Sequence, residues 1–337
     1  SDMHTLRFSP DGKLLLAQND SGIYVLTVNP FQTLFRIEAP EALSAQFTPD
    51  SKNIVFHNPG LRVETWSIAE QQRTDVAELL IREGCIQTDL SPDGQVLACF
   101  SGRFDLLLVD VATGERVFER KQFYTIGSIT EAFRYLRLVF RARMAGTEPQ
   151  VITLGFSPDA RYFAASGNNG LAFDLSSRAP VSLPGAAKRM LEHSFTFVDG
   201  NRLFGIRGGK GEKSALVAFP SGQPIKEIYV GAAHPTASAD GKYLLIRPVA
   251  DYPVGVVDVE RGEIFAAGEK PAMDIYGDLY VKEARRGDLA LYNRNGGQLA
   301  ASTTVPRGAL GSLRAAARRS EERRVGKECR SRWSPYH

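Results

Sequence analysis

The chain holds few side chains at the spacings that catalysis or metal binding requires. Ahead of the last nineteen residues, its histidines stand singly at positions 4, 57, 193 and 234, without the H-x-x-x-H or H-E-x-x-H spacing of a zinc site. The chain also lacks the G-x-S-x-G segment that carries the nucleophile of α/β-hydrolases. We therefore expect no catalytic residue, no metal ligand and no cofactor.

Carboxylates recur instead in one short turn sequence. Ser-Pro-Asp-Gly stands at 9–12, and variants of it return around Asp50, Asp93, Asp159, Asp199, Asp240 and Asp278. The intervals between these aspartates are 39, 43, 66, 40, 41 and 38 residues. Proline presets φ at the second position of a tight turn, aspartate suits the third, and glycine takes the next, which is often left-handed. The carboxylates therefore serve turns, and their regular interval predicts a repeat architecture.

Each repeat must build strands on both sides of its turn. In the first unit we expect strands over 5–8, 14–18, 23–28 and 33–37, and similar sets of four can be drawn in the later units. The second strand of a unit is a near-continuous apolar run, which suits a sheet covered on both faces. A ring of four-stranded sheets stacked face to face provides that cover and leaves only short edges.

The repeats resemble those of bacterial WD-repeat β-propellers. The resemblance rests on the FSPDG-type turn, the regular period, and the segments Val109-Asp110-Val111 and Thr113-Gly114, and it covers the chain to about residue 314. The pattern is also similar to TolB-like propellers and to the propeller domains of prolyl oligopeptidases. No unit has the Gly-His pair of the WD family, and its Trp-Asp pair is replaced by Val109-Asp110, Phe173-Asp174 and Val257-Asp258.

These observations predict an all-β fold for residues 1–318. We expect a seven-bladed β-propeller of four-stranded antiparallel blades, with a truncated eighth blade as the alternative. Residues 310–315 resemble the first strand of that further blade. We accordingly take the chain to be a fragment whose natural C-terminus is missing.

The interval of 66 residues indicates an insertion after the third blade, at about 123–147. Ser128 to Glu131 fits a helix capping box. Apolar residues stand at roughly helical spacing: Ile129, Phe133, Leu136, Phe140 and Met144. Four arginines lie among them: Arg134, Arg137, Arg141 and Arg143. Such a helix usually covers core and leaves its arginines in solvent; the alternative is a surface for a protein partner or a membrane. The run FRYLRLVFRAR also alternates as a strand would, so an extended hairpin is the other structural possibility.

Residues 319–337, RSEERRVGKECRSRWSPYH, resemble a translated sequencing adapter, so we expect a non-native, disordered tail. Removing its six basic and three acidic residues from totals of 41 and 38 leaves 35 of each. The formal charge then falls from +3 to zero, which does not favour nucleic-acid binding. No apolar run approaches the length of a membrane span.

Two cysteines remain ahead of that tail, Cys85 and Cys99, on either side of the turn at Asp93. In simple antiparallel register their side chains point to opposite faces of the sheet, so we expect buried thiols and no disulfide. The compartment stays open, with the cytoplasm slightly favoured.

The sequence thus favours a monomeric, non-catalytic scaffold propeller that binds a protein or peptide. Candidate contact residues lie in the loops between second and third strands, which share one rim: Asn19, Asp20, Arg62, Arg103, Asp105, Lys210 and Tyr252. The alternative is the gating or substrate-recognition propeller of a larger enzyme, such as a prolyl-oligopeptidase-like peptidase, whose catalytic part lies outside this chain. A sugar- or lactone-binding propeller enzyme is less favoured, because no convergent carboxylates mark a metal site.

Overall fold

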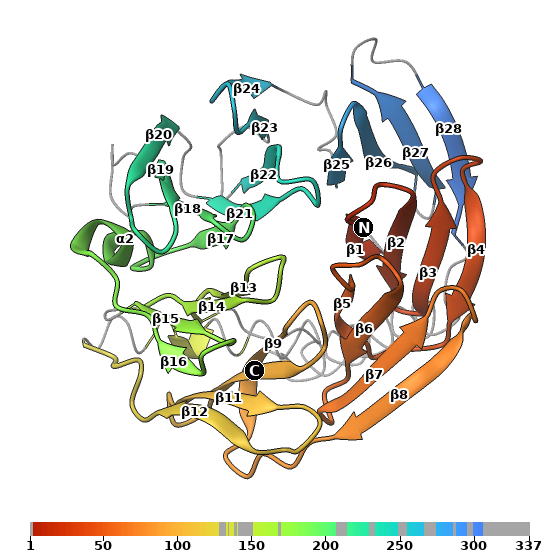
Figure 1. Cartoon of the computed structure of the whole chain (residues 1–337). Coiled ribbons are helices and arrows are strands. Elements are labelled where there is room, and N and C mark those ends of the chain that lie inside the picture. Colours follow the sequence, from red (N-terminus) through yellow and green to blue (C-terminus); the bar gives the residue numbers. More distant parts are fainter. Residues whose placement is uncertain are drawn as a thin grey trace, which may run out of the picture.

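The computed structural model is a ring of seven four-stranded sheets (Figure 1). It describes residues 3–127, 133, 135–137, 140, 151–167, 170–206, 214–228, 233–248, 255–265, 274–285, 288–294 and 299–305. Each sheet consists of four strands that are consecutive in the chain, and neighbouring strands pair antiparallel. The seven-bladed β-propeller predicted from the repeats is therefore confirmed.

The blades follow one another along the chain. Blade 1 contains β1 (Met3–Phe8), β2 (Leu14–Asn19), β3 (Gly22–Thr27) and β4 (Gln32–Ile37). Blade 2 contains β5 (Leu43–Phe47), β6 (Asn53–His57), β7 (Arg62–Ser67) and β8 (Gln72–Glu78). Blade 3 contains β9 (Cys85–Leu90), β10 (Val96–Ser101), β11 (Leu106–Asp110) and β12 (Arg116–Arg120). Blade 4 contains β13 (Leu154–Phe156), β14 (Tyr162–Ala165), β15 (Leu171–Asp174) and β16 (Ala179–Pro180).

The last three blades complete the ring. Blade 5 contains β17 (Phe195–Phe197), β18 (Arg202–Gly205), β19 (Ser214–Ala218) and β20 (Pro224–Ile228). Blade 6 contains β21 (Ala233–Ala237), β22 (Tyr243–Pro248), β23 (Gly255–Asp258) and β24 (Ile264–Phe265). Blade 7 contains β25 (Asp274–Tyr276), β26 (Leu279–Arg285), β27 (Asp288–Asn293) and β28 (Leu299–Thr304).

Burial follows the position of a strand within its blade. First strands of neighbouring blades contact one another, as β9 and β13 or β25 and β1 do, so first strands lie nearest the axis (Figure 1). Second strands such as β2 and β10 are buried on both faces, as their apolar runs predicted, whereas the outermost β8 is almost wholly exposed.

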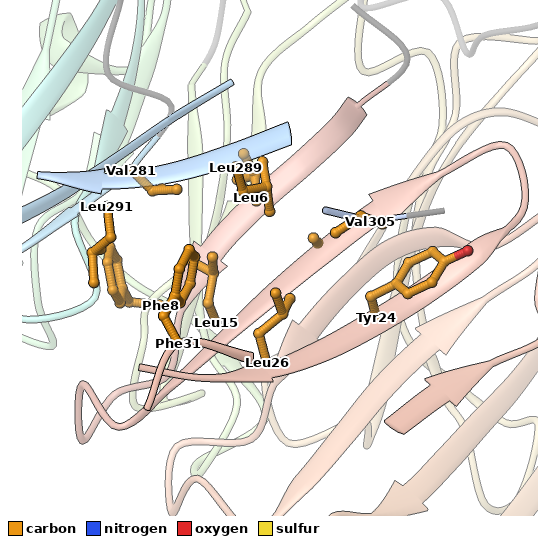
Figure 2. Close-up of a cluster of buried hydrophobic side chains, with 11 residues drawn as sticks. Leu6, Phe8, Leu15, Tyr24, Leu26, Phe31, Val281, Leu289, Leu291 and Val305 are labelled. Atoms are coloured by element: carbon orange, nitrogen blue, oxygen red, sulfur yellow. The ribbon is translucent and has the colours of Figure 1, made fainter. Parts of the chain in front are cut away.

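The ring closes by packing between the last blade and the first. Figure 2 shows this cluster, in which Leu6 and Phe8 of β1 meet Val281, Leu289 and Leu291 of blade 7. Closure therefore rests on apolar contact between two complete sheets, because blades 1 and 7 each form from one continuous stretch of chain.

The predicted turn chemistry is present in the structure. The Gly12 N–H donates to the Ser9 carbonyl over 2.9 Å, and Gly12 has a φ of +71°. The Ser9 hydroxyl donates to Asp11 over 2.7 Å, and the Lys13 N–H donates to the same carboxylate over 3.1 Å. The equivalent of Gly12 in blade 2 is Ser51, whose φ of +60° carries the cost of a left-handed backbone at a residue other than glycine.

Antiparallel order divides the connections between the two ends of the ring. Turns between first and second strands, and between third and fourth, lie at one end, which we call the turn rim. Loops between second and third strands, and connections from one blade to the next, lie at the other end, which we call the loop rim. Every predicted contact residue that the structure describes falls on or beside the loop rim.

The prediction that Cys85 and Cys99 stay unpaired is wrong. They form a disulfide, with their Cα atoms 5.5 Å apart. A bulge explains the error: Phe100 pairs with Gln87, but Ser101 pairs with Cys85, so Ile86 is an extra residue in β9. That extra residue moves Cys85 to the face that carries Cys99.

Among the described residues, two helical segments interrupt the strands, both on the loop rim. The short α2 (Gly185–Met190), which the sequence analysis missed, precedes β17 and buries Ala187 and Met190. In the insertion, residues 133, 135–137 and 140 are helical, as predicted. The expectation that the apolar stripe covers core is wrong for Phe133, Leu136 and Phe140, which are exposed.

Several predicted features lie outside the described residues. They are Lys210, Tyr252, Arg134, Arg141, Arg143, the possible further strand at 310–315 and the tail at 319–337.

Candidate functional site

The predicted contact residues of blade 1 maintain their own loop. Asn19 is buried, and its side-chain oxygen accepts hydrogen bonds from the Ser21 N–H over 2.9 Å and the Ser21 hydroxyl over 2.6 Å. Asp20 is partly buried beside it. The carboxamide of Asn19 therefore shapes the loop between β2 and β3.

Arg62 of blade 2 lies among carboxylates. Its guanidinium is 3.1 Å from Glu64 and 3.9 Å from Glu78, and Arg73 also approaches Glu64 over 3.7 Å. Glu64 is the least exposed member of this group, and both arginines approach its carboxylate. Their positive charges therefore balance the negative charge of Glu64.

Blade 3 brings the two other described candidates together in one loop. Asp105 is buried, and its carboxylate accepts a hydrogen bond from the Gln122 N–H over 2.9 Å. Its own N–H donates to the Ser101 hydroxyl over 3.1 Å. Arg103, by contrast, is exposed at the tip of the loop. Asp105 thus fixes the loop that presents Arg103.

A hollow of about 530 Å³ opens beside this loop, between blade 3 and the connection from blade 2. Its lining carries both charges: Glu83, Arg103, Asp105, Arg116, Glu119, Lys121 and Gln122. Arg116 bridges Glu83 over 2.5 Å and Glu119 over 3.0 Å. The hydrogen bond from Arg116 holds the pKa of the Glu83 carboxyl below its ordinary value.

Sequence reasoning found Arg103 and Asp105 of this hollow but missed Glu83, Arg116 and Glu119. Arg116 and Glu119 stand three residues apart on β12, whereas Glu83 comes from the connection before β9 and meets Arg116 only when blade 3 folds. No local pattern marks them, because a polar residue on an outer strand has the same sequence signature whether or not a hollow lies beside it.

An aromatic cluster adjoins the hollow. The ring of Phe104 lies 6.0 Å from Tyr124 and 5.2 Å from Tyr135, in edge-on or tilted contacts. Tyr135 belongs to the insertion, so this cluster fastens the helical residues of the insertion to blade 3. The hollow and the insertion consequently form one continuous part of the loop rim.

No group of three or more His, Cys, Asp or Glu side chains among the described residues could hold a metal ion. His57 is buried, its Nε2 lies 3.3 Å from the Thr88 hydroxyl, and burial lowers its pKa. His57 thus links blades 2 and 3 as a neutral side chain. Within the described part of the chain, no helix is long and apolar enough to cross a membrane.

Comparison with known proteins supports the fold. No family model matches the chain, and no curated protein matches its sequence. Among solved structures, the chain is similar to the β-propeller domain of Cps50 (Swd1) from Myceliophteria thermophila, with a TM-score of 0.52 and 13% sequence identity. The match covers 89% of this chain and 95% of that one. This likeness supports the β-propeller fold.

Proposed function

We propose that this propeller is a scaffold that binds a protein or peptide partner on its loop rim, with the hollow of blade 3 as the docking point. The observation that carries the proposal is the lining of that hollow. It combines the Glu83–Arg116–Glu119 ion pairs with exposed Arg103 and Lys121. The likeness to a WD-repeat-type propeller is consistent with a protein-binding role.

The form of the hollow favours a peptide over a small molecule. Small-molecule sites are mostly apolar and enclosed, whereas this lining is charged and its cations reach solvent. A peptide segment can satisfy both signs of charge with its own side chains, and Phe104 at the edge offers an aromatic contact of the kind found in interface anchors. Arg103 would meet an acidic side chain, and Glu119 a basic one.

A peptide library displayed on phage tests the proposal against the full chain. We expect the selected peptides to bind the unaltered protein and to lose about tenfold in affinity when Arg103 and Lys121 are both replaced by Glu. Lys13→Glu and Lys52→Glu form the matched control, because these lysines carry the same charge on the turn rim. Selected peptides that bind the Arg103/Lys121 variant as well as the unaltered protein would overturn the proposal.

We also propose that the ring is a monomer of bacterial origin that does not bind nucleic acid. Light scattering of the purified chain tests the first point, since a dimer would double the mass. The alternative, the substrate-recognition propeller of a larger enzyme, stays a prediction.

A further inference from the structure

We propose that the blade 3 sector of the loop rim docks on an anionic membrane surface. The sector comprises the connection at 79–84, the loop at 102–105, the end of β12 at 119–122 and the described helical residues of the insertion. Hydrogen bonding from the Gly102 N–H to the Gly84 carbonyl joins the first two, and the Phe104–Tyr135 contact joins the loop to the insertion. The sector is therefore one surface.

The most exposed large apolar side chains of the described structure gather here. Leu80 is 98% exposed, Phe133 68%, Leu136 61% and Phe140 65%. The other large apolar side chains that are exposed have exposed fractions of only 38% to 52%. They lie singly on the outermost strands of blades 1, 2, 5 and 7: Leu34, Val76, Ile225 and Leu299. Apolar side chains that concentrate on one sector mark it as an interaction surface.

The charge of this sector is basic. Its exposed cations are Arg82, Arg103, Arg120, Lys121 and Arg137. Its described acids are compensated or buried: Glu83 and Glu119 pair with Arg116, Glu78 at its border pairs with Arg62, and Asp105 is buried. Net positive charge beside exposed apolar side chains complements anionic lipid headgroups.

The shape of the sector favours a lipid surface over a protein partner. Phe133, Leu136 and Phe140 project into solvent, with spacings of three and four residues that place them on one side of the helix. Tyr135, on another side, packs against Phe104 and holds the helix to the ring. Projecting apolar side chains suit a fluid acyl layer, which needs no complementary shape.

This proposal shares Arg103 and Lys121 with peptide binding, but its apolar residues Leu80, Phe133, Leu136 and Phe140 are not part of the lining of the hollow. Variants of the apolar residues therefore test the membrane contact separately from peptide binding. A membrane contact at the rim would orient the ring with blade 3 toward the bilayer. The remaining sectors of the loop rim, in blades 1 and 5 for example, would then stay accessible.

Co-sedimentation with vesicles tests the proposal, using the full chain throughout so that the basic tail is constant. We expect binding to vesicles of phosphatidylcholine with phosphatidylglycerol, weaker binding to phosphatidylcholine alone, and release by high salt. The variant with Phe133→Ser, Leu136→Ser and Phe140→Ser should lose roughly tenfold or more in vesicle affinity. The matched control carries Leu34→Ser, Ile225→Ser and Leu299→Ser and should bind as the unaltered protein does.

A second measurement covers the case in which the triple variant fails to fold. In Phe140→Trp, phosphatidylglycerol vesicles with brominated acyl chains should quench the fluorescence by a larger fraction than they quench the combined Trp66 and Trp333 signal of the unaltered protein. Absence of binding by the unaltered protein, equal binding by the triple variant, or no additional quenching would each overturn the membrane proposal and leave a protein partner as the occupant of this surface.

Discussion

The two rims of this propeller use the same strands in opposite ways. On the turn rim, short polar turns repeat and bind their own backbone. They also bind one another: the Tyr276 hydroxyl donates to the Pro10 carbonyl over 3.1 Å, and the Gly277 N–H donates to Asp240 over 2.8 Å. On the loop rim, the connections differ in length from blade to blade, and charged and apolar side chains reach solvent around Arg103 and Phe133.

The difference shows where binding capacity comes from. A carboxylate such as Asp93, which already accepts bonds from Ser91 and the Gln95 N–H, has little left to offer a partner. On the loop rim, exposed side chains such as Arg103 and Phe133 contribute less to the stability of the fold. Variants should therefore affect mainly stability on the turn rim and mainly binding on the loop rim.

The largest expected effect concerns Asp274, close to the turn rim where the ring closes. Its carboxyl accepts hydrogen bonds from the Phe8 N–H over 2.7 Å and the Ile275 N–H over 2.9 Å. Burial raises its pKa from 3.8 to about 7. The folded chain thus binds an extra proton between these two values, and the free energy of unfolding that Asp274 contributes falls as the pH rises through this window. The fall is on the order of 3–4 kcal/mol.

Urea unfolding at several pH values measures this effect when the unaltered protein is compared with Asp274→Asn. His57, whose pKa is lowered, changes stability in the opposite sense, but it is common to both proteins and cancels in the difference. The stability of Asp274→Asn relative to the unaltered protein should rise between about pH 4 and pH 7. A constant difference would mean that Asp274 does not titrate in this window.

The next effect belongs to the loop-rim side of blade 3, where Cys85 and Cys99 close a loop with a sequence separation of 14 residues. Replacing both by Ala should lower the free energy of unfolding by about 3 kcal/mol in the absence of reductant, because the unfolded chain regains the entropy of that loop. With reductant, the two proteins should differ much less. Thiol alkylation of the unreduced folded protein at both positions would contradict the disulfide.

The sequence predicted the architecture because the turn that defines it is local. Strands were expected over 14–18 and 33–37 and occur at Leu14–Asn19 and Gln32–Ile37. The disulfide was missed because one bulged residue, Ile86, reverses which face Cys85 occupies, and no residue type announces a bulge there.

The candidate surface was predicted only in part. Helical spacing revealed the stripe of Phe133, Leu136 and Phe140 but not its direction, which depends on how Tyr135 packs on the ring. The short α2 carries no side-chain cap at Pro184, so its beginning lacks the usual sequence signal.

A pair of variants in blade 3 compares the two rims directly. Ser91 is buried. Its hydroxyl donates a hydrogen bond to Asp93 over 2.6 Å and accepts one from the Val96 N–H over 2.9 Å. Ser91→Ala should lower the free energy of unfolding by about 1–2 kcal/mol, because it leaves these partners unsatisfied. Arg103→Ala on the loop rim should stay within about 0.5 kcal/mol of the unaltered protein. Equal urea midpoint shifts for both variants would remove the contrast between the rims.

The smallest expected effect is a gain on the turn rim. Ala160 occupies the position that glycine holds in other turns, and its φ is +57°, against +71° at Gly12 and +74° at Gly94. An alanine with a left-handed backbone costs about 1–2 kcal/mol of stability, which glycine would avoid. Glycine also raises the conformational entropy of the unfolded chain, and this offsets part of the gain. Ala160→Gly should therefore raise the free energy of unfolding by about 0.5–1 kcal/mol.

Gly94→Ala is the reciprocal test. The alanine would have a left-handed backbone, and its added Cβ would lie 2.9 Å from the Val55 side chain. It should destabilise the ring by more than Ala160→Gly stabilises it, and both changes should leave vesicle and peptide binding unaltered. If Ala160→Gly weakened binding at the loop rim, the turns would be coupled to that surface, and the two rims could not be treated as separate in stability and in binding.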